Sequence, residues 1–291
     1  MSRTERFEAE RTRLFGVAYR MLGSVVEAED VVQDAWLRFD ARPDDEIVNA
    51  SAWLTTVTTR LAIDRLRSAR LTREEYVGPW LPEPMLTADV DDPADVVALA
   101  DSVSLAFLVV LERLDPVERA AFLLREVFSM SYADIAAVLD RTEAGCRQIV
   151  HRAKERIDPD RPVRYEPSPD EEQRLLEGFQ VALFTGDVDL LASVLADEVV
   201  AWSDGGADRR AARRPIVGRD RVVPYLLNLA KRYTDPSVDL GFELVPINAE
   251  PGVIISVDGE VTMAMTIEIG PGGIAGLRSI LNPRKLDHLR R

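Results

Sequence analysis

The chemistry that this sequence offers is concentrated in a basic stretch near the middle of the chain. Between Arg141 and Arg156, five Lys and Arg residues stand against two Glu residues. Helical spacing places Arg147, His151 and Lys154 on one face, where cationic groups suit phosphate contacts and hydrogen bonds to base edges. A merely solvated basic face is the plainer alternative. The residues predicted to contact DNA from this stretch are Thr142, Arg147, Gln148, His151, Arg152 and Lys154.

The surrounding elements predict how this stretch is presented. A Ser-x-x-Asp signal at Ser131 predicts a short helix, and apolar residues recur at helical spacing over residues 132–139. Thr142 is expected to cap a second helix that runs to Ile157. A helix-turn-helix of this kind places its second helix in the major groove of DNA. The preceding helix begins at residues 115–118, Asp-Pro-Val-Glu, which combine a capping Asp, a first-turn Pro and a Glu at the positive end of the helix dipole.

The first 72 residues predict three helices, over about residues 4–22, 24–39 and 52–69. Gly23 is typical of a helix end and Ser24 of a helix start. The second helix carries a row of polar residues and one leucine at helical spacing, namely Asp30, Gln33, Asp34 and Leu37. Such a row is either a solvated face or a docking surface for a protein partner, and spacing alone leaves both open. The third helix has outward basic residues that suit a nucleic-acid backbone, namely Arg60, Arg65, Arg67 and Arg70.

Two breakpoints divide the chain into domains. Residues 73–106 are rich in acids and hold four prolines, which predicts an acidic linker between residues 1–72 and the helix-turn-helix section at 107–160. A second run of prolines precedes a third domain, residues 168–291, in which helices come before short β-rich runs and Asp258–Gly259 marks a hairpin. The predicted fold class is therefore multidomain: two all-α domains followed by an α+β domain with a curved antiparallel sheet packed on helices.

Composition and charge exclude several classes of protein. The 291 residues include one cysteine and two histidines, too few for a disulfide framework or a zinc cluster, so we expect no metal and no cofactor. The N-terminus lacks the apolar core of a signal peptide, and no apolar run is long enough to span a membrane. We therefore expect a cytoplasmic protein with no membrane partner. The net charge of -14 argues against unaided, non-specific binding of nucleic acid.

Long parts of the chain resemble a known family. Residues 7–39 and 51–70 resemble conserved region 2 of bacterial sigma factors of the extracytoplasmic-function group, and residues 114–157 resemble their region 4. Three short motifs resemble those of the subgroup that carries a SnoaL-like C-terminal domain, namely WLPEP at 80–84, DGG at 204–206 and NPRKL at 282–286. The resemblance covers nearly the whole chain and implies that the third domain is a SnoaL-like cone.

This resemblance implies an alternative sigma factor, which binds the RNA polymerase core and directs promoter-specific transcription. The implied partners are the β′ clamp helices and the β flap of the polymerase, together with promoter DNA. Carboxylates and an amide at Asp30, Gln33 and Asp34 would meet basic side chains of the clamp helices. Residues 40–50 and the following helix would capture an unstacked base of the minus-ten element, and residues 142–156 would read the minus-thirty-five element.

Four positions depart from the motifs of the family. Asp140 stands where many relatives have the glycine of the helix-turn-helix turn, although Asp tolerates a left-handed backbone better than most residues. Gly145 lies inside the second helix and costs it about 1 kcal/mol relative to Ala. Ala207 replaces the last glycine of a DGGG-like motif, and Arg284 replaces Asp in an NPDKL-like tail, which weakens residue-level transfer in the third domain.

We expect the three motifs of the C-terminal subgroup to form a regulatory brace. The hypothesis is that the linker motif packs against the tail motif and the DGG loop, and so tunes the separation of the polymerase-binding and DNA-binding domains. The residues assigned to this brace are Trp80, Leu81, Pro82, Glu83, Pro84, Asp204, Gly205, Gly206, Asn282, Pro283, Lys285 and Leu286.

Two other functions stay open. A stand-alone, ligand-responsive regulator would bind its operator without polymerase, whereas a sigma factor acts only together with the core enzyme. A SnoaL-like enzyme would need a buried acid–base pair, but Asp204, Asp258, Glu260 and Glu268 fall at turns or strand positions without an obvious partner, so we expect no catalytic residue. SnoaL-like cones also hold small hydrophobic ligands in their open end, and the resemblance adds such a ligand as a further partner.

Overall fold

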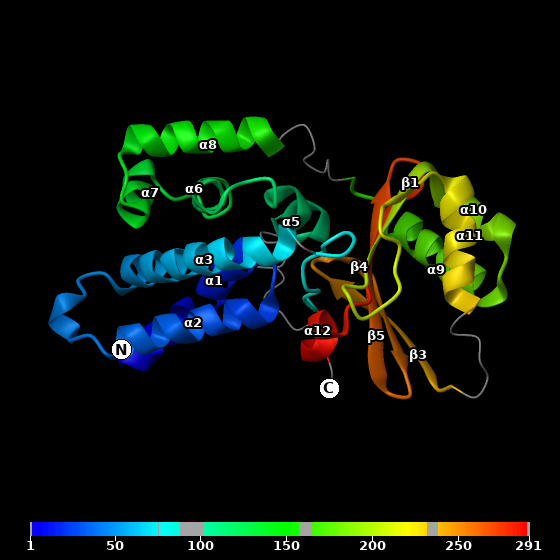
Figure 1. Cartoon of the computed structure of the whole chain (residues 1–291), viewed down its shortest axis with the longest axis horizontal. Coiled ribbons are helices and arrows are strands. Elements are labelled where there is room, and N and C mark those ends of the chain that lie inside the picture. The colour runs from blue at the N-terminus through cyan, green and yellow to red at the C-terminus, as the bar shows by residue number, and fades with distance from the viewer. Residues whose placement is uncertain (1, 75, 88–101, 158–164, 232–237, 290–291) are drawn as a thin grey trace. The chain divides into compact units, whose positions relative to one another are not determined.

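The computed structural model describes residues 2–74, 76–87, 102–157, 165–231 and 238–289, and the chain divides into two compact units (Figure 1). The first, here called the helical unit, comprises Met1–Glu75 and Ala106–Arg161. The second, the C-terminal unit, comprises Tyr76–Leu105 and Pro162–Arg291. The WLPEP motif, which lies in the linker between the two predicted helical domains, is therefore part of the C-terminal unit.

Three helices open the helical unit: α1 (Arg3–Leu22), α2 (Val25–Asp40) and α3 (Ala50–Glu74). Gly23 ends α1 in the left-handed conformation, and Ser24 caps α2 by accepting a hydrogen bond from the Glu27 N–H, both as predicted. A short 3-10 helix, η1 (Asp44–Glu46), precedes α3, which continues beyond its predicted end near Ala69. Apolar side chains from all three helices, including those of Phe7, Val32 and Leu54, share one buried cluster.

The next four described helices are α5 (Leu105–Leu111), α6 (Pro116–Glu126), α7 (Tyr132–Leu139) and α8 (Glu143–Ile157). Asp115 caps α6 in a reciprocal capping box with Glu118, as the Asp-Pro-Val-Glu run predicts. Helices α7 and α8 form the predicted helix-turn-helix. Asp140 ends α7 at a φ of 54°, the left-handed backbone that Asp tolerates better than most residues. The apolar faces of the two helices meet around Ile135 and Cys146.

Two buried arginines join the two groups of helices within the helical unit. Arg119 of α6 donates hydrogen bonds to the carbonyls of Met21 at 2.9 Å and Leu111 at 2.7 Å. Arg20 of α1 lies 5.5 Å from the ring of Phe128, and burial lowers the pKa of its guanidinium to about 10. Arg20 thus remains charged at neutral pH. Both predicted all-α regions are present, and they pack against each other in one unit.

The C-terminal unit is built on a six-stranded sheet in the order β2-β1-β6-β5-β4-β3. The strands are β1 (Leu195–Asp204), β2 (Ile216–Val217), β3 (Leu240–Ile247), β4 (Glu250–Val257), β5 (Glu260–Gly270) and β6 (Gly273–Ile280). The predicted hairpin at Asp258–Gly259 joins β4 and β5, with positive φ at both residues. Register shifts interrupt the β1–β6, β4–β5 and β5–β6 ladders, and such irregularities bend strands. The prediction of a curved sheet in an α+β domain is confirmed.

One strand pair differs from the antiparallel arrangement that the sequence predicts. Strands β1 and β6 run parallel, with Trp202 opposite Arg278, whereas the other four pairings among the described strands are antiparallel. Alternating apolar residues indicate which face of a strand is buried, but they carry no information about the direction of its neighbour. Because no short turn connects β1 to β6, their relative direction is set by the long crossover between them.

Helices α9 (Pro169–Thr185), α10 (Val188–Val194) and α11 (Arg219–Ala230) pack on one face of the sheet (Figure 1). Their apolar side chains form the main core of the unit with residues from the strands, such as Val199 and Met265. The chain closes with α12 (Pro283–Leu286) and a 3-10 turn, η4 (Asp287–Leu289). Among the described residues, no helix combines the length and apolar character that crossing a membrane requires.

Candidate functional site

The α2 face that was predicted to dock on a partner lies on the surface of the helical unit. Asp30 and Gln33 are exposed, Asp34 is half-buried, and the apolar side chain of Leu37 is 57% exposed. Arg65 of α3 lies 3.0 Å from Asp30 and 3.3 Å from Asp34. A predicted DNA contact is therefore paired with two predicted polymerase contacts.

The other basic residues of α3 also have partners inside the helical unit. Arg60 donates to the carbonyls of Val138 at 2.8 Å and Ala137 at 3.3 Å, near the C-terminal end of α7. Arg67 lies 3.3 Å from Asp64, one turn earlier on the same helix. Arg70 belongs to α3, but its side chain is outside the described residues. In this structure Arg60, Arg65 and Arg67 thus serve internal contacts that the sequence did not indicate.

An open hollow lies beside the loop that joins α2 to α3. Its lining combines cationic, aromatic and small side chains, namely Arg38, Ala41, Arg42, Ala52, Trp53, Thr56, Val57 and Arg60. Trp53 is half-buried, and its ring lies 5.8 Å from that of Phe39. An aromatic wall among cations suits an unstacked base and the phosphates beside it.

Helix α8 presents its predicted DNA contacts on the surface, and several of them have acidic partners. Thr142 accepts a hydrogen bond from the Gly145 N–H and so caps the helix. The guanidinium of Arg147 lies 2.9 Å from Glu143 and 5.0 Å from the ring of Tyr132. The remaining predicted contacts are Gln148 and Arg152, both exposed, His151 at 3.6 Å from Glu155, and Lys154 at 2.8 Å from Glu126.

In the C-terminal unit, the predicted brace residues meet at one buried carboxylate. Asp204 ends β1 and has no exposed surface. Its Oδ1 accepts hydrogen bonds from the Tyr76 hydroxyl at 2.5 Å and the Gly206 N–H at 3.1 Å. Its Oδ2 accepts from the Leu81 N–H at 2.8 Å and from Nζ of Lys285 at 2.7 Å. The WLPEP, DGG and NPRKL motifs therefore converge on this side chain.

Lys285 supplies the counter-charge for this carboxylate. Its ammonium is buried between the rings of Trp80, at 4.3 Å, and Tyr76, at 5.0 Å, and it also donates to the carbonyl of Leu81. Burial raises the pKa of the Tyr76 hydroxyl, and its hydrogen bond to Asp204 adds to this effect. The phenol therefore stays protonated and acts as a donor to Asp204. Asn282 caps α12 and donates to the Tyr76 oxygen at 2.8 Å.

The remaining brace residues pack around this centre. Leu81, Pro82, Pro84, Gly205, Gly206 and Leu286 are buried, and Glu83 and Pro283 are half-buried. His288, in η4, lies with its Nε2 2.7 Å from the carbonyl of Pro84. These contacts place the three motifs together, and their regulatory role stays a prediction.

Two residues that the motifs do not include make further contacts in this unit, Tyr76 at the Asp204 centre and Asn248 at Met85. Tyr76 precedes WLPEP and donates to Asp204. Asn248 lies at the β3–β4 turn, where its N–H donates to the Met85 carbonyl and its Oδ1 accepts from the Met85 N–H. Its side-chain amide also donates to the carbonyl of Val103 at 2.7 Å. Burial raises the pKa of Glu250 to about 7, and this carboxyl accepts a hydrogen bond from the Leu105 N–H. An Asn beside a strand end was the only sequence signal for Asn248, and it is typical of any turn.

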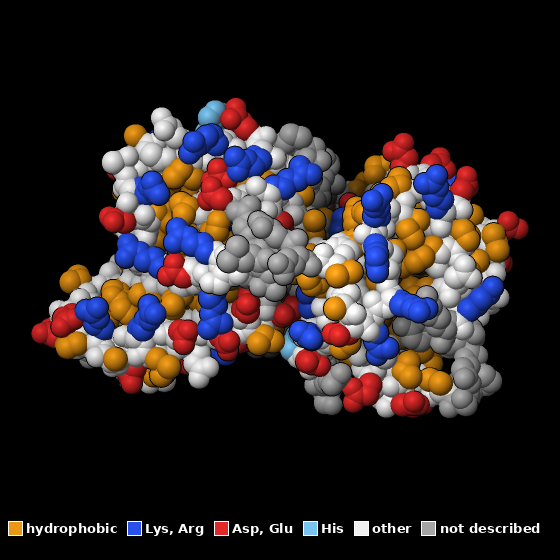
Figure 2. Space-filling model, viewed as in Figure 1, with side chains coloured by type: hydrophobic (Ala, Val, Ile, Leu, Met, Phe, Trp, Pro, Cys, Tyr) orange, Lys and Arg blue, Asp and Glu red, His pale blue; other side chains and the backbone are white. Residues whose placement is uncertain are grey.

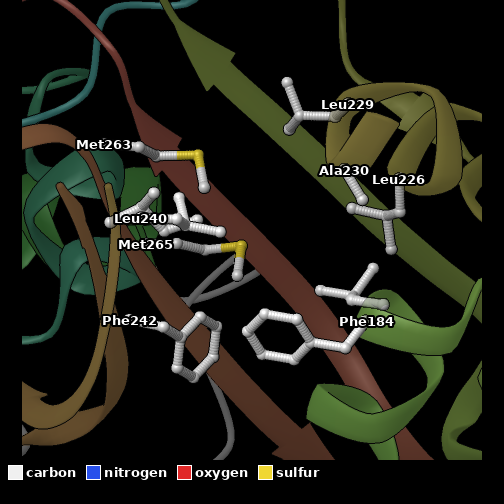
Figure 3. Close-up of a pocket in the computed structure, with 10 residues that line it drawn as sticks. Phe184, Leu226, Leu229, Ala230, Leu240, Phe242, Met263 and Met265 are labelled. Atoms are coloured by element: carbon white, nitrogen blue, oxygen red, sulfur yellow. The ribbon is translucent and has the colours of Figure 1, made fainter. Parts of the chain in front are cut away.

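An apolar pocket lies between α9, α11 and the sheet of the C-terminal unit (Figure 3). Its described lining residues are Leu183, Phe184, Leu226, Leu229, Ala230, Leu240, Phe242, Ile255, Met263 and Met265. The rings of Phe184 and Phe242 meet edge to face at 5.3 Å, and Figure 3 shows Met263 and Met265 pointing from β5 toward α11. Because every one of these side chains is apolar, this lining offers contact surface and no acid–base pair.

Comparison with known proteins identifies relatives over nearly the whole length. The model of the family "Sigma-70 region 2" matches residues 6–72, and that of "Sigma-70, region 4" matches residues 104–157. The chain is 40% identical over 288 residues to the ECF RNA polymerase sigma factor SigJ of Mycobacterium tuberculosis, covering 96% of this chain and 91% of that protein. It is 34% identical over 288 residues to "Probable ECF RNA polymerase sigma factor SigI" of the same species, covering 98% of this chain and 94% of that protein.

The fold is similar to a crystal structure as well. The match to M. tuberculosis extracytoplasmic function sigma factor SigJ has a TM-score of 0.76 at 35% sequence identity and covers 98% of both chains. The helical unit and the C-terminal α+β unit with its curved sheet are thus both part of the shared fold.

The Asp204 centre generates a prediction about stability. The Lys285→Met substitution leaves a buried carboxylate without its counter-charge, so we expect it to reduce the unfolding free energy of the C-terminal unit by about 3 kcal/mol. The measurement is urea unfolding of the full chain, followed by fluorescence. Asp204→Asn combined with Lys285→Met should reduce the unfolding free energy by less than the sum of the two single changes, since the two groups interact directly.

Arg284→Ala, on the same helix but 82% exposed, is the matched control and should change stability by less than about 0.5 kcal/mol. A Lys285→Met protein as stable as the control would contradict the role assigned to this pair.

Proposed function

The chain belongs to the extracytoplasmic-function sigma factors, and from that premise we propose how its parts contribute to transcription initiation. As a member of this family it is an alternative sigma factor that directs transcription by RNA polymerase. We propose that α2 docks on the β′ clamp helices and that residues 107–160 meet the β flap. In this proposal the hollow beside Trp53 captures a base of the minus-ten element, and α8 reads the minus-thirty-five element.

The exposed face of α2 is the observation that carries the polymerase part of the proposal. It places an exposed leucine, Leu37, next to a row that contains Asp30, Gln33 and Asp34. An apolar side chain bordered by carboxylates is a suitable contact for a basic helical partner, because the carboxylates pair with cations while the leucine loses contact with water. Arg65 already holds two of these carboxylates, so a basic partner would compete with it.

The DNA part of the proposal depends on basic side chains exchanging their partners. Arg60 binds carbonyls of α7, whereas Arg147 and Lys154 pair with Glu143 and Glu126. Exposed ion pairs contribute only about 0 to 1 kcal/mol each, so DNA phosphates can replace these carboxylates at little cost. We infer that Arg60 has to leave α7 before it can contact DNA.

We further propose that the Asp204 centre acts as the brace of the C-terminal unit. It binds the segment after α3 to the end of β1 and to α12, so the chain that leads from α3 toward α5 is anchored on the sheet. Anchoring shortens the length of free chain between the helices that are assigned to the two promoter elements. Because this anchoring uses only side chains and backbone of the protein, the proposed regulatory role does not require a bound ligand.

A second candidate role concerns the apolar pocket. We propose that it binds a small, uncharged hydrophobic molecule, as its wholly apolar described lining favours. The same lining argues against catalysis in this pocket, because general acid–base chemistry requires titratable groups within reach of the substrate.

The docking role of α2 predicts a loss of polymerase affinity. Replacing both Asp30 and Asp34 with Asn should weaken binding to core RNA polymerase by about tenfold or more, because two charge-assisted contacts are lost. The measurement is titration of fluorescently labelled protein with the core enzyme. Glu8→Gln combined with Asp64→Asn removes two exposed acids from α1 and α3 and should leave the affinity unchanged. Equal affinities of the two double variants would refute the assignment.

If α8 reads the minus-thirty-five element, substitutions on its surface should weaken promoter binding without affecting binding to core polymerase. The Arg147→Ala and Arg152→Ala variants should each lower run-off transcription from the protein's own upstream region by about tenfold, while core binding stays intact. Arg174→Ala, on an exposed position of α9, serves as the control. The assay also includes reactions without core polymerase. Specific, high-affinity promoter binding without the core enzyme would favour the stand-alone regulator instead.

The pocket predicts binding of an uncharged probe. N-phenyl-1-naphthylamine should become fluorescent with the full-length protein, and the Met265→Trp variant should reduce this signal because the larger side chain fills the space. Val181→Trp, at an exposed position of α9 outside the lining, should leave the signal unchanged. Circular dichroism checks that both variants fold. An unchanged signal from a folded Met265→Trp protein would show that the probe binds elsewhere.

A further inference from the structure

The C-terminal unit carries a concentration of arginines that none of the roles above uses. Residues 207–221 contain six arginines and two aspartates, in a chain whose net charge is -14. Four of these arginines lie in the connection between β1 and β2, namely Arg209, Arg210, Arg213 and Arg214. All four are exposed, and Figure 2 shows several Lys and Arg side chains on the surface of this unit.

These four arginines are not paired within the described part of the chain. No carboxylate there lies within ion-pairing distance of any of their guanidinium groups. The acids and bases nearby pair with each other instead: Arg219 lies 2.9 Å from Asp197, and Asp208 lies 3.4 Å from Arg284. This differs from Arg65, Arg147 and Lys154, each of which has an acidic partner. As far as the described residues go, the connection therefore presents to solvent four positive charges that have no acidic partner.

The connection between β1 and β2, here called the arginine loop, is held in place at its base. The Arg209 N–H donates to the Gly205 carbonyl at 3.1 Å, and Gly205 and Gly206 are buried next to Asp204. On its other side, the backbone of Arg213 packs close to Gly78, where an added Cβ would lie 3.7 Å from the Arg213 Cα. A loop anchored at both points loses less conformational entropy on binding than a free chain would.

The chain between Ile157 and Tyr165 joins α8 to the C-terminal unit and limits the distance between them. Helix α8 ends at Ile157, and the described part of the C-terminal unit resumes at Tyr165. Eight residue steps span at most about 28 Å, whatever conformation the connection adopts. When α8 is bound to a duplex, the first described residue of the unit that carries the arginines, Tyr165, must therefore lie within about 28 Å of the end of that helix.

We propose that Arg209, Arg210, Arg213 and Arg214 bind the phosphate backbone of duplex DNA just upstream of the element read by α8. Guanidinium groups bind phosphates in a bidentate manner, and such contacts contribute affinity without reading sequence. The proposal rests on the promoter-reading role of α8. An acidic surface of the polymerase is the competing partner, and the experiment distinguishes it from DNA.

The test uses holoenzyme, made from the full-length chain and core polymerase, with two promoter fragments. One fragment ends just upstream of the minus-thirty-five element, and the other extends about 20 base pairs further, two turns of the duplex. The wild-type holoenzyme should bind the longer fragment about tenfold more tightly, with a salt dependence steeper by about two to four in the log–log slope. Replacing the four arginines with Gln should abolish this difference while binding of the short fragment stays unchanged.

Two further variants complete the design. Replacing the four arginines with Lys keeps the charge and should retain most of the difference between the fragments. Arg174→Gln combined with Arg221→Gln removes exposed arginines from α9 and α11 and should retain all of it. Circular dichroism and binding of the short fragment show that each variant is folded.

Three results would overturn the proposal: no preference of the wild type for the longer fragment, a preference that survives the four Gln substitutions, or equal losses on both fragments together with weaker core binding. The last result would assign the loop to the polymerase. Failure of the wild-type holoenzyme to bind the short fragment would instead reject the promoter-reading role of α8, so the two failures are distinguishable.

Discussion

The buried carboxylate of Asp204 holds the segment around WLPEP and the C-terminal helix α12 against the sheet of the C-terminal unit. An ionised carboxylate without water costs several kcal/mol unless a counter-charge and hydrogen bonds compensate for it. Asp204 obtains both, because Tyr76, Leu81 and Lys285 donate to its two carboxylate oxygens. The N–H groups of Leu281 and Asn282 donate to its backbone carbonyl and so tie the start of α12 to the end of β1. These donors come from two segments that are far from Asp204 in the chain. Each segment depends on the other, since loss of either leaves a buried charge poorly compensated.

Basic side chains have a comparable structural role in the helical unit. Arg119 binds carbonyls of Met21 and Leu111 and so joins α6 to α1 and α5, and Arg60 binds the last turn of α7. Arg65 occupies the carboxylates of α2. In this acidic chain, Arg60 and Arg65, which are proposed to contact DNA, are thus held in internal contacts. Among the described residues, the four exposed arginines between β1 and β2 have no acidic partner, and because they lie within six positions of one loop they suggest an external partner.

Local features of the fold followed from the sequence, because short-range interactions decide them. The capping residues Ser24 and Asp115, the turn at Asp140 and the hairpin at Asp258–Gly259 depend only on residues within a few positions. The parallel pairing of β1 with β6 did not follow, because burial patterns do not encode strand direction. The short motifs located most of the Asp204 centre by resemblance, yet Tyr76 of this centre was missed, as was Asn248, which binds Met85 next to the WLPEP motif, because neither residue belongs to a motif.

The sequence by itself determined the two helical regions, the helix-turn-helix with its basic face, the α+β character of the C-terminal domain and the family. These properties reside in periodicity, caps and motifs that each occupy a continuous stretch of chain. Only the tertiary structure decided which charges are buried, which arginines are paired and which segments share a unit. The physical reason is that the free energy of a charged group depends on its solvent exposure and on partners that can lie more than a hundred residues away, as for Tyr76 and Asp204.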